Sequence, residues 1–598
     1  MPKIPIGQTQ TGSGTTPQKD KETIEIIHAD VLEIEKTKHP KTGKVEETRR
    51  LIGHVEVKQG ETIMRCDSAI LYSNRNDLDA LGSVHIEQPD SLDIFAEQLF
   101  FKGNKRIAYL YKEVELTDSK SNIQSDTLTY YLNERRAVLH SDVTLKEQQV
   151  TITSDSLTYF VENRKAIIHS DVHLSDAQKE VYSDSLIYSV DDQQAAFRRN
   201  VRLVDEKMEI STESMDYNVP TQQGSYNSGG RVVNGETILT SQSADYFGAD
   251  NRVVFKQDVN LTSPQYTMTT AELDYDINTE KAKFNGETLI ENKGSTIVST
   301  KGVYDVANDA LKLDERATIQ NEGQEIQADD FFYDQNKGYG EAKGKVSWAD
   351  TTRNLTIKSE NMRFYDENET VEAFDQALLM NLIEGDTLYI TADTLKTVME
   401  TVFDSLTQRT DTVQTFYAYK NVRILKSDMQ GVCDSLVYSL KDSTFKMFQK
   451  PILWFGDNQM YADTLVVFTH NNEPTHIELK KKAFIGNKLE KYVYNQIKGR
   501  DITGYFDSSM LKRILVEGNA ESVYYIQNDS LEYVGVNKAS SSRMWIYARN
   551  QEIDYIKFLD QPDATFHPIQ KIDPKRFILA GFRWWETKRP KTIIDLLQ

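Results

Sequence analysis

The sequence predicts an all-β protein in which bent antiparallel strands stack in repeats of about 29 residues. Three observations predict this fold: a ring that returns at a fixed spacing, apolar residues that alternate with polar ones, and short polar turns between the alternating segments. A chain of 598 residues could form several domains on length alone, but a repeat array overrides that estimate because each repeat packs only against its neighbours.

A tyrosine recurs every 29 residues through the first half of the chain. Each ring usually ends a segment of the form small-Asp-Ser/Thr-Leu-x-Tyr, as in Ser-Asp-Ser-Leu-Thr-Tyr at residues 154–159. A ring kept in register over so many copies indicates a repeat protein. The positions are Tyr130, Tyr159, Tyr188, Tyr217, Tyr246, Tyr275, Tyr304 and Tyr333, with Phe101 one period earlier.

A second register, mostly of valine, runs in phase with the tyrosines. Around Val172 the apolar and small residues fall at every second position of residues 166–174, and residues 137–145 repeat that alternation around Val143. A period of two is typical of a β-strand, so two registers per repeat predict two strands per repeat. The register comprises Val114, Val143, Val172, Val201, Val259, Thr288, Ala317 and Val346, and Gly230 interrupts it.

Polar residues are expected to bend the strands and to connect them. The segment Ser154-Asp155-Ser156 predicts a bend within the tyrosine-bearing strand, fixed by an Asp side chain that accepts from backbone amides. Four-residue turns are predicted at 133–136, 162–165 and 190–193. Such tight connections favour antiparallel strands, although a parallel β-helix could have repeats of the same length. Strands bent in this way predict two facing sheets with a trough between them.

Changes in spacing and composition divide the chain into four predicted segments. Residues 1–23 are polar and are predicted to form a disordered tail, and residues 24–350 hold the regular repeats. Residues 351–550 continue as irregular repeats with insertions, the largest of which, about 397–414, is predicted to be a polar surface loop or a short helix. Residues 551–598 gather prolines, aromatic residues and basic residues, which indicates a cap for the array or a docking tail for a partner.

Composition argues against several classes of protein. A net charge of −21 argues against a nucleic-acid partner, which would require a basic surface. The chain has no run of about 18 apolar residues, so no transmembrane helix is expected, and its first residues lack the apolar region of an export signal. Cys66 and Cys433 occupy the same place in the repeated motif and are expected to be small buried residues rather than a disulfide.

The sequence carries no motif of catalysis, metal binding or cofactor binding. His140 and His169 each precede a Ser-Asp pair, but their recurrence one repeat apart is better explained by duplication than by a catalytic triad. The repeated Asp residues lack the Gly-rich context of calcium-binding β-rolls. We therefore expect no enzyme activity, no metal and no cofactor.

The apolar residues of each repeat are expected to face the trough, which makes them candidates for binding acyl chains. Burying a methylene contributes roughly 0.8 kcal/mol, so a twelve-carbon chain contributes on the order of 9 kcal/mol before ordering costs. In the alternative, the sheets close on each other and the same residues form an ordinary core. The candidates are Leu128, Tyr130, Leu139, Val143, Leu145, Ile152, Leu157, Tyr159, Ile168, Val172, Leu174, Leu186 and Tyr188.

These motifs resemble the OstA-like family, which is related to the periplasmic lipopolysaccharide-transport protein LptA and to the N-terminal domain of the outer-membrane protein LptD. The resemblance rests on the motif of residues 154–159, the turn Asn-Glu-Arg-Arg at 133–136 and the spacing Ala137, Val143, Leu145. It covers most of residues 24–510, and Gly-Phe-Arg-Trp at 581–584 is similar to the ending of long OstA-like proteins.

The resemblance implies an elongated β-jellyroll that binds the acyl chains of lipopolysaccharide and passes them across the periplasm to the outer membrane without catalysis. It also implies other jellyroll proteins of the Lpt type as partners at the ends of the array, because open end strands can pair with further strands. Two alternatives stay open: a structural or adhesive rod of the cell envelope, and a carbohydrate-active β-helix with carboxylates and basic residues clustered in its trough.

Overall fold

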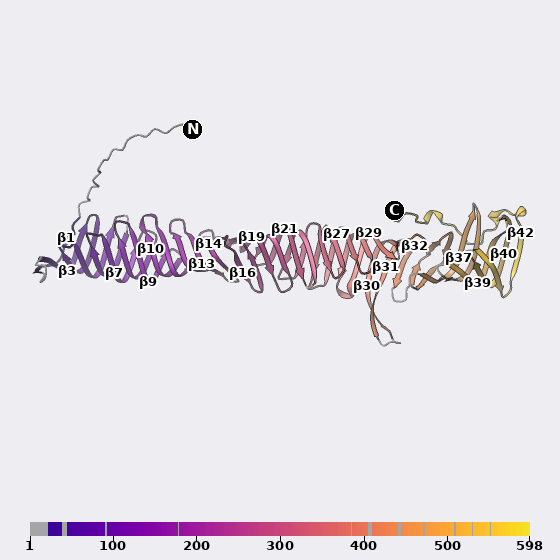
Figure 1. Cartoon of the computed structure of the whole chain (residues 1–598), viewed down its shortest axis with the longest axis horizontal. Helices are drawn as coiled ribbons and strands as arrows, with labels where there is room; N and C mark the ends of the chain where they lie inside the picture. The colour runs from indigo at the N-terminus through magenta and orange to yellow at the C-terminus, as the bar shows by residue number, and fades with distance from the viewer. Residues whose placement is uncertain are drawn as a thin grey trace, which may run out of the picture. The chain divides into compact units, whose positions relative to one another are not determined.

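The computed structural model describes residues 22–38, 45–89, 92–176, 179–292, 294–383, 385–404, 409–439, 444–470, 473–507, 510–528, 530, 532–549 and 552–597. The predicted N-terminal tail lies almost wholly outside these residues. The described part of the chain forms 42 strands, and every pairing resolved between them is antiparallel. The all-β repeat fold is confirmed, and the parallel β-helix is wrong. The chain, whose strands Figure 1 draws, divides into two compact units: residues 1–262 with 275–278 form unit 1, and residues 263–274 with 279–598 form unit 2.

Unit 1 consists of strands connected mostly by short turns, in which each strand pairs mainly with its neighbours in the chain. Its elements are β1 (Glu25–His28), β2 (Val31–Lys38), β3 (Val45–Gln59), β4 (Thr62–Tyr72), β5 (Asp77–Gln88), β6 (Leu92–Lys102), β7 (Ile107–Thr117), β8 (Asn122–Tyr131), β9 (Arg136–Glu147), β10 (Val150–Phe160), η1 (Val161–Asn163), β11 (Lys165–Ser175), β12 (Lys179–Ser189), β13 (Gln194–Asp205), β14 (Met208–Asn218), β15 (Gln223–Tyr226), β16 (Gly230–Asn234), β17 (Thr237–Ser241), β18 (Ser243–Phe247), η2 (Gly248–Asp250) and β19 (Arg252–Thr262).

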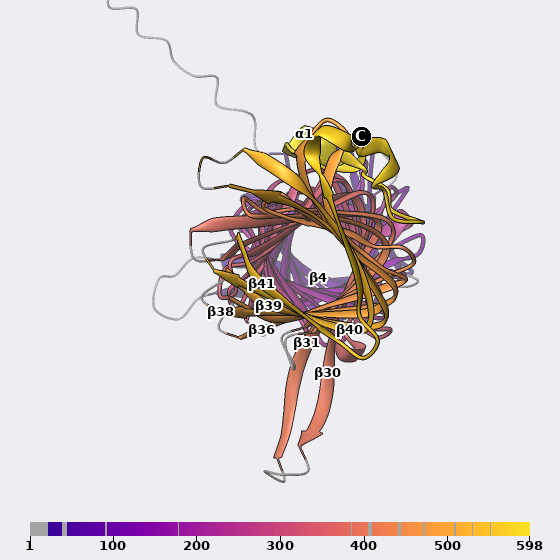
Figure 2. The same cartoon turned by 90° about the vertical axis from the view of Figure 1, so that its right-hand side faces the viewer.

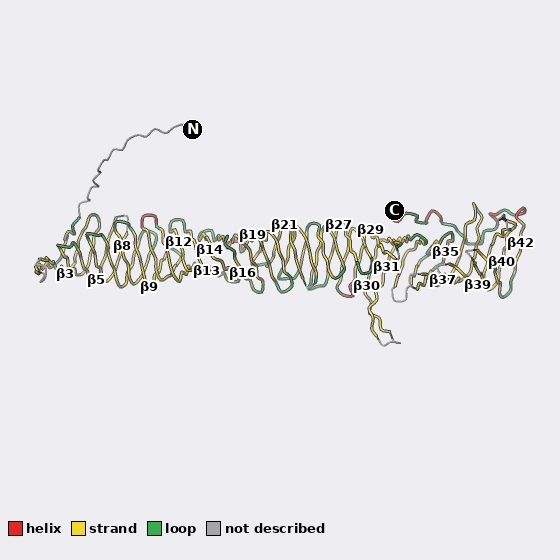
Figure 3. Tube along the Cα trace, in the orientation of Figure 1, coloured by secondary structure: helices red, strands yellow, loops and turns green. Residues whose placement is uncertain are grey.

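Unit 2 continues the same pattern of antiparallel strands, with longer strands toward its C-terminal end (Figure 3). Its elements are β20 (Thr267–Asp276, mostly in this unit), β21 (Lys281–Asn292), β22 (Ser295–Asp305), β23 (Ala310–Leu313), β24 (Ala317–Asn321), β25 (Gln324–Ala328), β26 (Asp330–Asp334), β27 (Tyr339–Asp350), β28 (Leu355–Tyr365), η3 (Glu367–Glu369), β29 (Thr370–Ile383), β30 (Asp386–Asp404), β31 (Arg409–Leu425), β32 (Met429–Ser439), β33 (Thr444–Phe448), β34 (Ile452–Phe455), β35 (Asn458–Tyr461), β36 (Thr464–His470), β37 (Glu473–Glu490), β38 (Val493–Asp507), β39 (Met510–Gln527), β40 (Tyr533–Arg549), β41 (Glu552–Leu559), β42 (Asp563–Pro568), η4 (Ile569–Lys571), η5 (Pro574–Arg576), η6 (Glu586–Lys588) and α1 (Ile593–Leu597).

The rings stack in register between small residues. Tyr159 in β10 lies opposite Ala137 in β9 and Ala166 in β11, so alanines on both neighbouring strands leave room for the buried ring. Alternate residues of these strands are buried, as a period of two requires. Each repeat thus buries a ring and the valine register on one face.

The strands bend near the middle, but at residues different from those expected. The bulge lies on the valine-bearing strand, where Ser170 and Asp171 adopt left-handed backbone angles (φ 66° and 50°). Asp and Asn tolerate this region better than most residues, and a bulge bends a strand. On the tyrosine-bearing strand, Ser154 Oγ donates to the carbonyl of Ser156 (3.3 Å), so a serine rather than an Asp side chain bonds to the backbone there.

Two kinds of turn alternate along unit 1. The ring-side turns, such as residues 132–135, 161–164 and 190–193, follow the tyrosine-bearing strands close to the predicted positions. The far turns, such as residues 118–121 and 148–149, connect the opposite strand ends. Ring-side turns stack on one another: the Val161 amide donates to the Arg135 carbonyl and the Val190 amide to the Arg164 carbonyl, both at 3.0 Å. The turns therefore repeat with the same 29-residue period as the rings.

The prediction of a polar loop or short helix at about 397–414 is wrong. β30 and β31 continue as one long hairpin through this region, with Thr397 paired to Phe416 and Val402 paired to Asp411. The hairpin projects from the other strands of unit 2 (Figures 1 and 2). Its polarity comes largely from threonines that alternate with valines, and such β-branched residues favour strands over helices.

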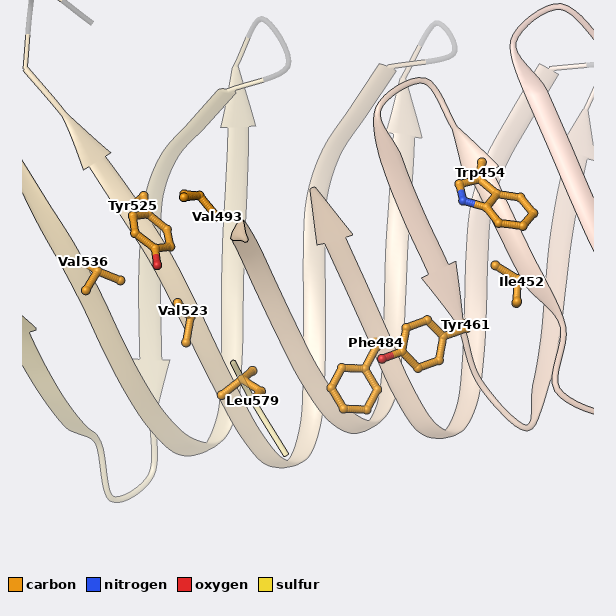
Figure 4. Packing of buried hydrophobic residues seen from close by; sticks show 9 residues of the cluster. All are labelled: Ile452, Trp454, Tyr461, Phe484, Val493, Val523, Tyr525, Val536 and Leu579. Atoms are coloured by element: carbon orange, nitrogen blue, oxygen red, sulfur yellow. The ribbon is translucent and has the colours of Figure 1, made fainter. Parts of the chain in front are cut away.

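The C-terminal segment of residues 569–597, here called the strap, runs back along unit 2. The amide of Gln496 in β38 exchanges two hydrogen bonds with the strap backbone, at the Phe577 carbonyl and the Leu579 amide (both 2.8 Å). Gln459 in β35 does the same farther along, at the Arg583 carbonyl (2.7 Å) and the Trp585 amide (2.8 Å). Leu579 enters an apolar cluster (Figure 4) with Ile452, Trp454, Tyr461, Phe484, Val493, Val523, Tyr525 and Val536.

Both cysteines are buried and free, as predicted. Burial raises the pKa of each thiol to about 12, so both stay protonated at neutral pH.

Candidate functional site

All thirteen residues predicted to line a groove lie in β8 to β12 and face the interior of unit 1. Their exposed fractions are 0–2%, so their side chains pack against one another and fill the interior. The structure brings the predicted set together as one continuous apolar lining that repeats from strand to strand. Contact of this lining with acyl chains remains a prediction.

The tyrosine hydroxyls tie the two kinds of turn together along a line that we call the seam. Tyr159 OH donates to Asp118 Oδ2 (2.6 Å), Tyr188 OH to Glu147 Oε2 (2.8 Å) and Tyr246 OH to Asp205 Oδ2 (2.6 Å). In each case the acceptor lies 41 residues earlier, in or beside a far turn. At these three positions the tyrosine hydroxyl closes the seam, which a phenylalanine could not do.

Burial and hydrogen bonding control the protonation of the phenols and carboxylates in the seam. Burial raises the pKa of Tyr159, and the neighbouring Asp118 carboxylate raises it further, so the phenol stays neutral and donates. For Asp118, burial would raise the pKa, but hydrogen bonds from Tyr159 and from the amides of Lys120 and Ser121 bring it below its ordinary value. The carboxylate therefore stays charged and accepts. A hydrogen bond to a charged acceptor is among the stronger ones in a protein.

Further polar contacts reinforce the seam of unit 1. Arg164 Nη2 donates to Ser119 Oγ (2.9 Å), and its Nε lies 3.6 Å from Asp118 Oδ2. Lys120 Nζ pairs with Asp191 Oδ1 at 2.7 Å. These contacts join a far turn to two ring-side turns, so the seam is closed by more than the phenols.

Sequence reasoning missed the polar partners of the phenols, although a signal was present. Asp118, Glu147 and Asp205 accept from tyrosine hydroxyls, whereas Asn234 Nδ2 donates to Tyr275 OH (3.0 Å). Polar residues also recur every 29 positions, in phase with the rings but 41 residues before them. They were overlooked because their identity changes between acids, amides and serine, whereas the ring is constant. The series is Asp118, Glu147, Asp176, Asp205, Asn234, Ser263 and Asn292.

In unit 2 the ring register ends after Tyr333. Tyr304 OH still lies 3.1 Å from Ser263 Oγ, and Tyr333 OH donates to Asp366 Oδ2 (2.7 Å). The next two copies of the motif, residues 359–364 and 392–397, carry Phe364 and Thr397 at the ring position. Neither side chain has a phenol that could tie the seam.

An apolar cavity of about 290 Å³ lies where the ring is missing, between β28 and β32. Ring-side ends of strands contribute Thr397, Gln414 and Phe416, and far-turn ends contribute Leu355 and Leu388. A second cavity of about 180 Å³ shares lining residues Leu388 and Tyr438 with the first. Its remaining lining is Lys426, Asp428, Met429, Phe445, Leu453, Phe455, Met460, Val467, Thr469, Glu473, Pro474, Ile477 and Phe506.

The mouth of the larger cavity is polar. The partly exposed lining residues, here called the mouth, include Arg353 and Lys396; Arg353 pairs with Asp350 (3.0 Å) and Lys396 with Glu372 (2.9 Å). Leu382 at the same mouth is 50% exposed. The cavity is therefore connected to the surface beside a partly exposed apolar side chain.

Other chemistry is sparse in the described residues. They contain no group of three or more His, Cys, Asp or Glu side chains placed to hold a metal ion. His140 and His169, which recur one repeat apart, are both exposed. Among the same residues, no helix has the length and apolarity needed to cross a membrane.

The fold and its lining define a class: all-β repeat proteins whose bent antiparallel strands form a jellyroll around an apolar interior. Residues 21–184 and 133–271 match the OstA-like protein family, and residues 225–322 match the family described as lipopolysaccharide-assembly, LptC-related. The chain is thus related to the OstA-like family, as its motifs predict. No curated protein matches the chain.

Proposed function

We propose that the protein is a non-catalytic lipopolysaccharide-binding bridge of the periplasm, which carries acyl chains inside its jellyroll toward the outer membrane. One observation carries the proposal: the apolar lining of unit 1 repeats every 29 residues, so each strand pair offers an acyl chain an equivalent site. A chain can then move from one site to the next with little change in free energy. The matches to OstA-like and LptC-related proteins support the same function.

An acyl chain must part the seam in order to enter the filled interior. A hydrogen bond to a charged group contributes about 1.5–3 kcal/mol net, and a neutral one about 0.5–1.5 kcal/mol. Burial of a twelve-carbon chain contributes on the order of 9 kcal/mol. One chain therefore compensates for the loss of a few ties, and the seam closes again once the chain has passed.

The polar part of the lipid is proposed to stay outside the jellyroll. The net charge of −21 would repel an anionic headgroup from much of the surface. Arg164 and Lys120 lie beside the seam with side chains 31% and 46% exposed, but both pair with Asp191, so a phosphate would have to compete with that carboxylate for them. The headgroup would thus follow the seam while the acyl chains follow the interior.

Other jellyroll proteins of the Lpt type are the proposed partners. β2 is exposed along its whole length and includes Ile34 with 56% of its surface exposed. An exposed strand near the start of the array, with Val31, Leu32 and Ile34 among its residues, favours addition of a strand from another protein.

Photocrosslinking tests the proposal at the lining itself. A photoreactive residue at Leu157 or Val172 is expected to form adducts with lipopolysaccharide, because both side chains face the interior. The matched control is Thr158, which lies beside Leu157 but points to the opposite face. Failure to label at either interior position, while the protein stays folded, would contradict the proposal.

A structural or adhesive rod of the envelope is the second candidate, because the interior of unit 1 is filled by its own side chains. The two candidates differ in the lipid that accompanies the protein. Purification from its native envelope is expected to retain lipid with 3-hydroxyacyl chains, whereas a purely structural rod would retain none in stoichiometric amount.

A further inference from the structure

We infer that the cavity between β28 and β32 is a lateral portal, through which one acyl chain that carries a hydrogen-bond donor passes between the surface and the interior of unit 2. The inference rests on the proposed function, because it names the place where an acyl chain crosses the seam. Four features of the described residues support it: the missing ring, the local change of turn, the chemistry of the lining and the composition of the mouth.

The missing ring makes both the space and the opening. Thr397 occupies the ring position of its motif and is 2% exposed, but its short side chain lines the cavity instead of filling it. It pairs with Val371 in β29 and Phe416 in β31, where a tyrosine of unit 1 pairs with alanines. A single substitution in the repeat thus removes a core ring and a seam tie together.

The turn pattern changes at the same place. In the preceding repeats of unit 2 the ring-side turns stack, as the Asp366 amide donates to the Gly338 carbonyl (2.9 Å). At the next position β30 and β31 continue outward as the long hairpin. Gln414 and Phe416, which line the cavity, belong to the base of this hairpin. Because the hairpin extends past the seam, no ring-side turn among the described residues stacks on the preceding turn at this position.

The lining indicates the chemical class of the ligand. Most of it is leucine, isoleucine and aromatic side chains, and an apolar cavity of about 150 Å³ is known to admit benzene, so about 290 Å³ has room for several methylenes. Gln414 is 5% exposed, and its Oε1 has no hydrogen-bond partner among the described residues. A buried acceptor without a partner is costly. A hydroxyl or amide N–H on the acyl chain would satisfy it.

The mouth favours recognition by the chain and its donor rather than by phosphate. Arg353 and Lys396 are both paired with carboxylates, so the mouth offers little net positive charge. The exposed Leu382 extends the apolar lining to the surface. A hydroxylated or amide-linked acyl chain fits this combination better than a free anion.

Binding at the cavity is tested in the full chain with 3-hydroxytetradecanoic acid and tetradecanoic acid as probes. A photoreactive phenylalanine in place of Phe416 is expected to label with both acids and more strongly with the hydroxylated one. Thr397→Tyr, which restores the ring, is expected to reduce labelling at least tenfold. Thr356→Tyr is the matched control, because Thr356 lies on the outer face of β28. Gln414→Leu is expected to remove the preference for the hydroxylated acid and to retain labelling by the plain one.

Passage is tested with lipopolysaccharide and a photoreactive phenylalanine at Phe284, a fully buried interior position of β21 in unit 2. Labelling at 284 is expected in the parent and in Thr356→Tyr, and to fall at least tenfold in Thr397→Tyr. Equal labelling in both tyrosine variants would overturn the portal and leave the proposed function standing. No labelling at 284 or 157 in any variant, with the acids still binding at 416, would overturn the proposed transport and the portal's role in it. Melting temperatures within a few degrees of the parent would show that the variants fold.

Discussion

The tied repeats of unit 1 and residues 353–438 of unit 2 use the same motif and differ in the residue at one position. In unit 1 a tyrosine fills the interior and closes the seam, and Ile168 and Leu174 are fully buried. In the second region Phe364 and Thr397 stand in place of the tyrosine, Thr397 without any ring, and a cavity lies beside Leu379 and Phe416, which are 5% and 9% exposed. The presence of a ring at this position therefore decides whether the apolar interior is filled or leaves a cavity.

The two regions also differ on the outside. The strap covers part of the outer face of unit 2 through the glutamines Gln459 and Gln496, whereas the outer faces of β8 to β12 carry exposed polar residues. The end of the strap also contacts the region of the missing ring, where Thr391 Oγ1 donates to the Leu596 carbonyl (3.2 Å).

The largest expected effect is the difference in stability loss between a substitution in the filled interior and one beside the cavity. Ile168→Ala is expected to lower the local stability of unit 1 toward the upper end of about 2–5 kcal/mol, because the lost contacts leave a void in a filled core. Ile390→Ala, beside the cavity, should fall near the lower end because fewer contacts are lost. Hydrogen exchange of amides in β11 and β30 measures both. Equal losses of stability in the two variants would contradict the difference between a filled interior and an interior beside a cavity.

Gln459→Leu is expected to loosen the strap at a cost of about 1–3 kcal/mol, because two backbone groups of the strap lose their partners beside a fully buried side chain. Limited proteolysis between residues 577 and 592 should become faster. Gln527→Leu, at the exposed last residue of β39, is the control and should leave the cleavage rate unchanged. An unchanged cleavage rate in Gln459→Leu would show that the hydrogen bonds of Gln459 do not hold the strap.

Tyr188→Phe is expected to cost about 1–3 kcal/mol, because the buried Glu147 loses its 2.8 Å hydrogen bond while the ring stays in place. Tyr182→Phe is the matched control in the same strand, since its hydroxyl bonds to Glu180 on the exposed side. Thermal unfolding followed by circular dichroism compares the two. A smaller loss for Tyr188→Phe than for Tyr182→Phe would argue that the phenols do not close the seam.

The smallest expected effect is on the pH dependence of the melting temperature. Because the folded-state pKa of Asp118 is below its ordinary value, its contribution is fully present above the usual Asp pKa of about 3.9 and is lost as pH falls through the folded value. The melting temperature of Asp118→Asn should therefore fall less than that of the parent between pH 5 and pH 2, by about a degree or two. Parallel curves would indicate that Asp118 does not contribute to acid sensitivity.

The ring period predicted the repeat, and the alternation of apolar residues predicted the strands and the buried lining from Leu128 to Tyr188, because burial on one face follows from alternation. The short polar turns favoured the antiparallel order, which the period alone left open. The acceptors of the seam were not predicted, since the contact between Tyr159 and Asp118 depends on how far the strands curl around the interior. The hairpin of residues 386–425 was misread because its threonines were counted as polar rather than as β-branched. The contacts of the strap join residues more than 80 positions apart, as in Gln496 with Phe577, and no local pattern indicates them.

The strap is made after every strand that it covers. Until residues 577–585 have been synthesised, Trp454, Phe484 and Tyr525 lack the side chains that pack against them from outside. Incomplete chains therefore expose these apolar side chains to solvent and to other proteins, and synthesis of the strap covers them. A truncation just before the strap would convert this brief stage of biogenesis into a permanent one, with self-association as its expected result.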